Sequence, residues 1–151
     1  MLSGIIYDTV MKAKIVVDTC VLIAALRSKR GASYKLFKLM GQEAFDISLS
    51  VPLVFEYESA AKKIARSVGL KYTEIDDILN YLCSVAEHHR IHFLWRPFLR
   101  DPNDDMVLEL AVECGASFIV TYNLKDFEGI ANFGVVAVTP QEFLHRIGEL
   151  R

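Results

Sequence analysis

Acidic residues occur at points of the sequence where buried strands are expected to end. Asp18 closes the apolar run "KIVV", and Asp126 follows the later apolar run "SFIVT". In open α/β sheets, ligands bind beyond the carboxyl ends of the strands, so we expect these carboxylates to share one crevice. Carboxylates in one pocket repel one another unless a cation neutralises them. Oxygen ligands without clustered His or Cys favour Mg²⁺ or Mn²⁺, and such an ion can promote hydrolysis of a phosphodiester bond.

The segment "DPNDD" supplies a further candidate carboxylate at the start of a helix. Asp101 is interpreted as the helix N-cap, because Pro102 follows at the first helical position. On a helical wheel, Asp104 shares the packed side of this helix with Val107, whereas Asp105 points well away. The pattern therefore favours Asp104 as the residue directed toward the sheet.

Four other groups of residues have a structural interpretation beside a functional one. Glu56 and Glu58 flank the apolar stripe of one helix on opposite margins, and spacing does not choose between them. Asp126 also fits a turn residue in "NLKDF". The run "HHRIH", residues 88–92, spans an expected helix-to-strand junction and lacks a third nearby metal ligand, which argues against a histidine site. Cys20, close to Asp18, is interpreted as a small buried filler.

Short apolar runs alternate with helical patterns along the chain, which predicts an α/β fold. We expect a three-layer α/β/α sandwich around a mainly parallel central sheet. The expected helices include one from Ser50 to about Ser67 that stops near Gly69, one capped by Thr73, one from Asp101 to Gly115, and a closing helix with a capping box from Thr139 to Glu142. The expected strands are 14–18, 45–49, "RIHFL" at 90–94, "SFIVT" at 117–121 and "VVAV" at 135–138.

Length, composition and charge narrow the class of protein. The 151 residues fit one domain, and the 52% hydrophobic content with a mean hydropathy of +0.27 excludes a disordered chain. The net charge of −2 provides no overall basic field for nucleic acid, so such a partner would need local clusters. The candidate basic clusters are Arg27, Lys29, Arg30, Lys35 and Lys38, and Arg90, Arg96 and Arg100.

Targeting and redox features predict a cytoplasmic protein. The cysteines are three in number, widely spaced and without a C-x-x-C pair, which fits a reducing compartment. No apolar run reaches the roughly 18 residues of a membrane span, and no signal peptide is recognisable. Because "MKAKIVVD" resembles a natural beginning, residues 1–13 are predicted to be an N-terminal leader before a single domain of residues 14–151.

Several blocks, in order, resemble the PIN-domain nuclease family. "IVVDTCVLIAAL" is similar to the family's opening strand, "LVFEYESA" to its second acidic position, and "DPNDDMVLELAVECGASFIVTYNLKDFEGI" to its third and fourth. Within the family the chain resembles the VapC-type toxins of prokaryotic toxin-antitoxin pairs. The resemblance covers residues 14–150. Two positions depart from the pattern: Cys20 stands where Asn or Ser is usual, and Asn123 stands where some relatives carry Asp.

The resemblance implies a function and a set of site residues. The implied activity is Mg²⁺- or Mn²⁺-dependent endonucleolytic cleavage of RNA, often by a homodimer that a cognate antitoxin inhibits. Asp18 and Asp104 are then primary metal ligands, Glu56 a direct or water-mediated ligand, and Asp126 a second-metal or outer group, with Thr121 and Asn123 shaping the site. The choices of Glu56 over Glu58, and of Asp126 over Asp105 or Asn123, stay open. The alternative is a PIN-like module that binds RNA or protein without cutting.

Overall fold

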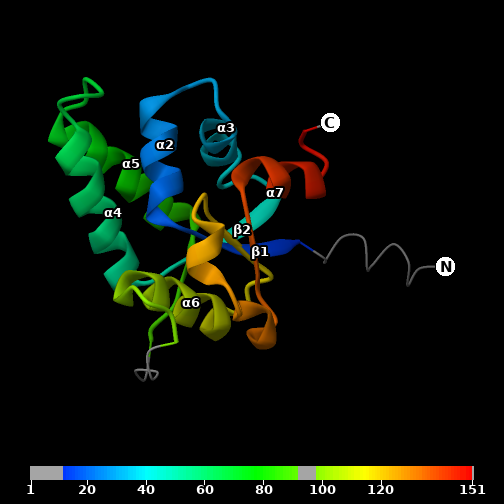
Figure 1. The fold of residues 1–151 in the computed structure, drawn as a ribbon. Coiled ribbons are helices and arrows are strands. Elements are labelled where there is room, and N and C mark those ends of the chain that lie inside the picture. The colour runs from blue at the N-terminus through cyan, green and yellow to red at the C-terminus, as the bar shows by residue number, and fades with distance from the viewer. Residues whose placement is uncertain (1–11, 92–97, 151) are drawn as a thin grey trace.

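The chain folds around a five-stranded sheet in the order β3-β2-β1-β4-β5 (Figure 1). The computed structural model describes residues 12–91 and 98–150. All strand pairs within this part of the chain are parallel, which confirms the predicted sheet. The strands are β1 (Ala13–Val17), β2 (Phe45–Leu49), β3 (Glu87–His88), β4 (Phe118–Val120) and β5 (Val136–Val138).

Helices cover both faces of the sheet, as the predicted three-layer sandwich requires. Figure 1 shows α6 on one side of β1 and β2, with α2, α3 and α7 on the other side and α4 and α5 beside them. The α-helices of the described residues are α2 (Thr19–Arg27), α3 (Ala32–Lys38), α4 (Val51–Ile64), α5 (Tyr72–Val85), α6 (Pro102–Cys114) and α7 (Pro140–Arg146). Two short 3₁₀ helices, η1 (Leu124–Phe127) and η2 (Ile130–Phe133), join β4 to β5.

Residues 15–17 of β1 and 119–120 of β4 are fully buried, which explains their continuous apolar sequence. Val17 of β1 lies opposite Val120 of β4 in the parallel register, and both are completely buried. The ladder continues one step further, because the backbone N–H of Asp18 donates to the carbonyl of Val120 at 2.9 Å. The first polar residues after the two strands, Asp18 and Thr121, therefore emerge side by side at the carboxyl edge of the sheet.

Helix caps follow the sequence signals closely. The side chains of Ser50, Asp101 and Thr139 each accept a backbone N–H in the first turn of their helix, so three of the four predicted N-caps are confirmed. Gly115 ends α6 in the left-handed region at φ +70°, where a side chain would be strained. These caps fix where α4 and α6 begin, and both helices begin next to the carboxyl edge of the sheet.

Three expected boundaries were wrong. The third strand is Glu87–His88, which pairs with Ser48 and Leu49, and Arg90 and Ile91 of "RIHFL" are not in a strand. The rest of that run lies outside the described residues. Helix α5 begins at Tyr72, because the Glu74 carboxylate accepts the N–H of Lys71, and Thr73 is not its cap. Helix α4 ends at Ile64, earlier than Ser67, and a turn leads to Gly69.

Most of the predicted leader, residues 1–11, lies outside the described residues, so the leader stays a prediction, although Ala13 already belongs to β1. Among the described helices, none combines the length and the apolar character that a membrane crossing requires.

Candidate active site

Asp18 is held rigidly at the end of β1 by neighbouring donors. Its carboxylate is buried, with Oδ1 accepting the backbone N–H of Thr19 at 2.9 Å and Oδ2 accepting the hydroxyl of Thr121 at 2.7 Å. Thr121 Oγ1 in turn accepts the N–H of Asn123 at 3.0 Å. Asp18 is also the N-cap of α2, so strand, helix and the loop after β4 together fix its orientation. Such fixation is what a preorganised ligand or catalytic group needs.

Cys20 completes the packing around Asp18. Its Sγ lies 3.6 Å from Asp18 Oδ2 and 3.6 Å from Thr121 Oγ1. Burial, and then the Asp18 charge, raise the pKa of the Cys20 thiol, while a backbone hydrogen bond from Tyr122 lowers it in part. The raised pKa favours a neutral thiol that donates weakly to Asp18. Cys20 is only half-buried, less than the buried filler expected from the sequence, and it has this polar contact in addition.

Glu56 faces the site, and Glu58 does not. Burial raises the pKa of Glu56, the Thr19 hydroxyl opposes this, and the charge of Asp18 raises it further. Neither Thr19 Oγ1 nor Glu56 Oε2, both buried, makes a hydrogen bond of normal geometry within the described part of the chain. Glu58 instead forms an ion pair with Lys62 at 2.9 Å. In the structure Glu56 therefore lies near Asp18 and Glu58 does not, while the role of Glu56 as the second acidic group of the site stays a prediction.

Tyr57 explains why Glu56 lies where it does. The fully buried Tyr57 hydroxyl donates to the carbonyl of Val17, the last residue of β1. This bond attaches α4 to the end of the central strand, immediately before Asp18. Burial raises the pKa of the Tyr57 phenol well above its usual value, so the hydroxyl stays a donor at every physiological pH.

Asp104 experiences the strongest crowding of negative charge. Burial is the largest cause that raises the pKa of Asp104, which reaches about 7. The other causes are neighbouring carboxylates, those of Asp18, Asp101, Asp126 and Glu56. A carboxyl group with this pKa holds a proton for part of the time at neutral pH, and a cation placed among these groups would displace that proton.

Asp104 and Asp126 line one cavity of about 520 Å³ beside the carboxyl edge of the sheet. Asp126 belongs to η1 and reaches this cavity because its N–H bonds to the carbonyl of Asn123, which forms the turn after β4. The other residues that line the cavity are Phe98, Leu99, Arg100, Asp101, Lys125 and Glu128. Sequence reasoning treated Asp101 only as a cap and overlooked Lys125, which directly precedes Asp126.

The expected direction of Asp105 was wrong. Its side chain is buried, at 9% exposure, and it does not point away from the molecule. Asp105 Oδ1 accepts the N–H of Leu99 at 2.8 Å and the N–H of Phe98 at 3.2 Å. The helical wheel considered only packing against the sheet, whereas the segment before α6 folds over this side of its first turn. Asp105 therefore satisfies backbone donors and is not a free carboxylate of the cavity.

The carboxylates lie near one another without forming a finished coordination sphere. Within residues 12–91 and 98–150, no three side chains of the His, Cys, Asp and Glu types are spaced to hold one metal ion together. His92 of the "HHRIH" run lies outside this part of the chain, and the His88 ring bonds to the carbonyl of Cys83. The arrangement can attract a cation through charge, and the side chains would have to rearrange to ligate it.

Comparison with known proteins places the chain in a family. The family model described as "PIN domain" matches residues 14–125, which is most of the chain. Among solved structures, a chain in the crystal structure of VapBC2 from Rickettsia felis, bound to a DNA fragment from their promoter, is similar. It shares 17% sequence identity at a TM-score of 0.58, over 83% of this chain and 98% of the other. No curated protein matched. The chain belongs to the PIN-domain family.

Proposed function

We propose that this protein is a metal-dependent endoribonuclease that hydrolyses RNA phosphodiester bonds. The observation that carries the proposal is the group of carboxylates without a cationic partner at the carboxyl edge of the sheet, where burial, and then the neighbouring carboxylates, raise the pKa of Asp104 to about 7. The buried Oε2 of Glu56 supports it, because within the described residues this oxygen makes no hydrogen bond of normal geometry, and such a buried oxygen is costly unless a ligand meets it. An all-oxygen donor set suits Mg²⁺ or Mn²⁺.

Each residue has a proposed role. Asp18, fixed by Thr121, and Asp104 are the primary ligands of Mg²⁺ or Mn²⁺, and Glu56 binds the ion directly or through water. Asp126 is a ligand of a second ion or an outer group, because it lines the same cavity as Asp104. When bound, the divalent ion supplies charge stabilisation and an activated water for attack on phosphorus. Lys125 lies at the same cavity and can hold a phosphate oxygen of the substrate.

A nuclease assay tests this proposal. Purified protein is incubated with labelled single-stranded RNA and Mn²⁺, with EDTA as the blank. We expect cleavage that EDTA stops and that Asp18→Asn reduces by at least about a hundredfold, because a ligand mutation removes the metal-dependent stabilisation. Asp77→Asn is the matched control, since Asp77 is exposed on α5, outside the candidate site. Equal cleavage by Asp18→Asn and the parent would exclude this site, and no cleavage by the parent would favour a non-catalytic binding module.

We further propose that the protein is the toxin of a toxin-antitoxin pair and acts as a homodimer. The similarity in fold to a chain of VapBC2 from Rickettsia felis supports the first point. The exposed apolar side chains of Val51 and Phe55, at 66% and 65% exposure at the start of α4, support a protein interface. Light scattering should give the mass of a dimer for the parent and a smaller mass for Phe55→Glu. A monomeric parent would contradict the dimer.

A further inference from the structure

A groove rich in positive charge lies at the far end of α2 from Asp18. It has a volume of about 410 Å³ and runs between the α2–α3 connection and α3. Its lining includes Lys29, Arg30, Tyr34, Lys35, Lys38 and Gln42, without a carboxylate among the described residues. No acidic residue occurs in the sequence from Arg27 to Gln42, although the whole chain has a net charge of −2. The positive charge is therefore concentrated in one place.

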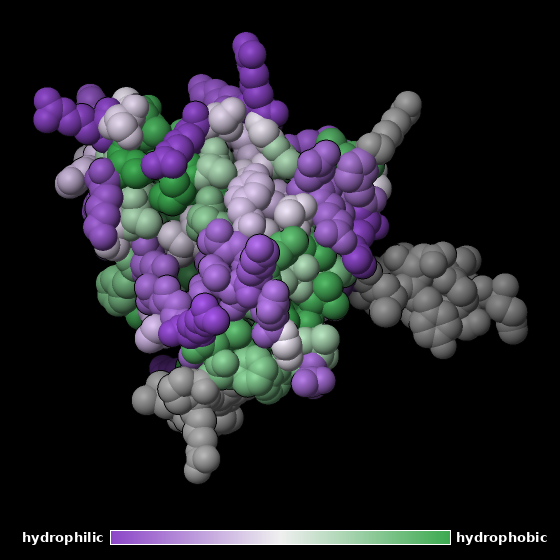
Figure 2. Space-filling view, viewed as in Figure 1, coloured by the Kyte–Doolittle hydropathy of each residue, from purple (hydrophilic) through white to green (hydrophobic). Residues whose placement is uncertain are grey.

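The cations of this groove are not neutralised by neighbouring acids. Within the described part of the chain, no carboxylate lies within ion-pair distance of any of them. Lys35 Nζ donates to the neutral backbone carbonyl of Glu149 at 2.6 Å, which orients the ammonium group and leaves its charge intact. Lys38 Nζ lies 5.9 Å from the centre of the Tyr34 ring. Figure 2 shows hydrophilic side chains projecting at the margin where Figure 1 places the α2–α3 connection.

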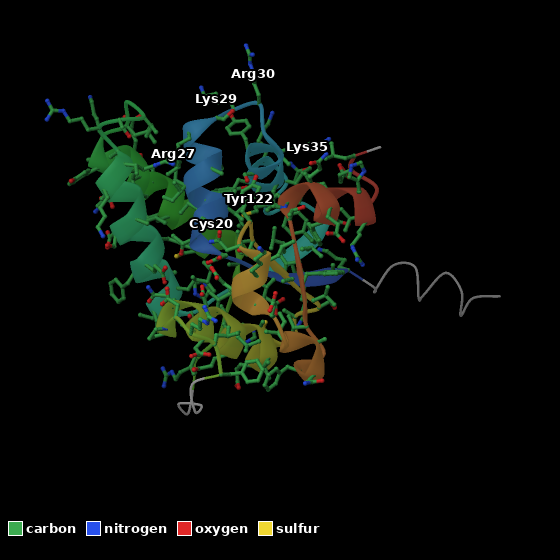
Figure 3. The ribbon with its side chains drawn as sticks, in the orientation of Figure 1. Cys20, Arg27, Lys29, Arg30, Lys35 and Tyr122 are labelled. Atoms are coloured by element: carbon green, nitrogen blue, oxygen red, sulfur yellow. The ribbon has the colours of Figure 1, made fainter. Side chains whose placement is uncertain are left out.

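Tyr122 connects this groove to the carboxylates. It directly follows Thr121, which holds Asp18, and its hydroxyl forms a 2.6 Å hydrogen bond with Ser33 Oγ on α3. Tyr122 is 47% exposed, so part of its side chain is accessible to a ligand. Figure 3 shows Tyr122 and Cys20 toward one end of α2 and Arg30 at the other. Nine helical residues span about 13 Å, which a few nucleotides of single strand can cover.

We propose that single-stranded RNA runs along this surface, with its phosphates on Lys29, Arg30 and Lys35 and a base stacked on Tyr122, before it enters the carboxylate site. The inference rests on the proposed nuclease function for the identity of the strand. Proteins that bind single-stranded nucleic acid without sequence preference combine a positively charged groove with exposed aromatic rings. An acidic peptide would use the cations but would gain nothing from the aromatic ring.

Binding measured without catalysis tests the groove separately from the nuclease activity. Fluorescence anisotropy of a labelled oligouridylate in EDTA is followed across a salt series. For single strands the salt slope changes by about 0.7 per phosphate contact, so Lys29→Ala/Arg30→Ala should lower the slope by about 1.4. The same relation gives about fivefold per contact at about 0.1 M salt, and about 25-fold weaker binding for the double variant. Lys63→Ala/Arg66→Ala removes the same charge from exposed positions in the last turn of α4 and in the turn after it, and should change affinity less than about twofold.

The ring of Tyr122 has its own pair of variants. Tyr122→Leu removes stacking and should weaken oligouridylate binding about tenfold, whereas Tyr122→Phe keeps the ring and should bind like the parent. Equal losses in the two double-alanine variants, or no binding by the parent, would overturn the proposal. If oligoglutamate displaces the labelled oligouridylate as effectively as unlabelled RNA does, the proposal is also overturned, in favour of an acidic protein partner. If the parent binds through the groove but cleaves nothing with Mn²⁺, the proposed nuclease function fails and the groove stands.

Discussion

Replacing Asp104 by Asn should make the metal-free protein more stable while removing its response to metal. The pKa of Asp104 is about 7 in the folded chain, against 3.8 for an ordinary aspartate. Between these values the folded state holds a proton that the unfolded state has lost. Stability contributed by this group is therefore complete below about pH 4 and declines as the pH rises toward 7. Asn carries no charge and avoids this decline.

The magnitude follows from the pKa of Asp104. One pKa unit corresponds to about 1.36 kcal/mol, so the whole difference from 3.8 to about 7 is about 4 kcal/mol. Asp104 is only partly buried, and solvent screening reduces the effect to about 1–2 kcal/mol at pH values above about 7.5. For a domain of this size, that gain raises Tm by about 3–6 °C. Near pH 4 the variant and the parent should melt together.

Thermal unfolding followed by circular dichroism measures both parts of this prediction. Each protein is melted in EDTA and in Mn²⁺, at about pH 4 and about pH 8. Mn²⁺ at about a hundred times its Kd should stabilise the parent by about 2.7 kcal/mol at the higher pH and Asp104→Asn by much less. Asp77→Asn controls for the loss of one surface charge. If Asp104→Asn is less stable than the parent in EDTA at about pH 8, or keeps the full Mn²⁺ shift, the reasoning about crowded carboxylates is wrong.

Four further substitutions separate ligand roles from structural ones. Glu56→Gln should reduce the shift in Tm that Mn²⁺ causes, while Glu58→Gln should leave this shift unchanged. Glu58→Gln removes the surface ion pair with Lys62 and should cost at most about 1 kcal/mol of stability. Equal Mn²⁺ shifts in the two variants would contradict the assignment of Glu56. Asp105→Ala should destabilise the fold by about 1–3 kcal/mol in chemical denaturation, because two backbone donors lose their acceptor. Thr121→Val removes the hydroxyl that donates to Asp18 and should raise the Mn²⁺ concentration needed for half-maximal cleavage. If this concentration is the same as for the parent, Asp18 does not need the Thr121 hydroxyl to hold its position.

The order of strands and helices was predictable from local patterns because the central strands are buried on both faces. A continuous apolar run such as Ile15 to Val17 is typical of a strand that helices cover on both faces. Caps such as Asp101, followed by Pro102, mark the start of a helix through local chemistry alone. The third strand was misplaced for the opposite reason. Glu87 and His88 have a polar sequence, and only their pairing with β2 makes them a strand. Pairing at the edge of a sheet is a tertiary property that local sequence does not carry.

The candidate site likewise contains residues that local sequence identifies and residues that it does not. Asp18 was identifiable because it ends a strand, and a strand end is a local feature. The choice between Glu56 and Glu58 depends on how α4 is rotated, and that rotation follows from the bond between Tyr57 and the carbonyl of Val17, forty residues away along the chain. The burial of Asp105 depends on the segment before α6, whose backbone N–H groups it accepts, and a helical wheel does not include that segment. Contacts between distant segments therefore decide which carboxylates stay available.

The candidate ligands also differ from the other acidic residues of the molecule in the partners of their carboxylates. Outside the site, Glu58 and Asp76 share the ammonium group of Lys62, and Asp105 is satisfied by backbone donors. At the site, Asp18 has only neutral donors, and within the described residues no Lys or Arg lies within ion-pair distance of it or of Asp104. Arg100 and Lys125 line the same cavity as Asp104, but among the described residues neither lies within ion-pair distance of it. The carboxylates therefore keep a charge that a cation from solution can neutralise, which supports the metal proposed for this edge of the sheet.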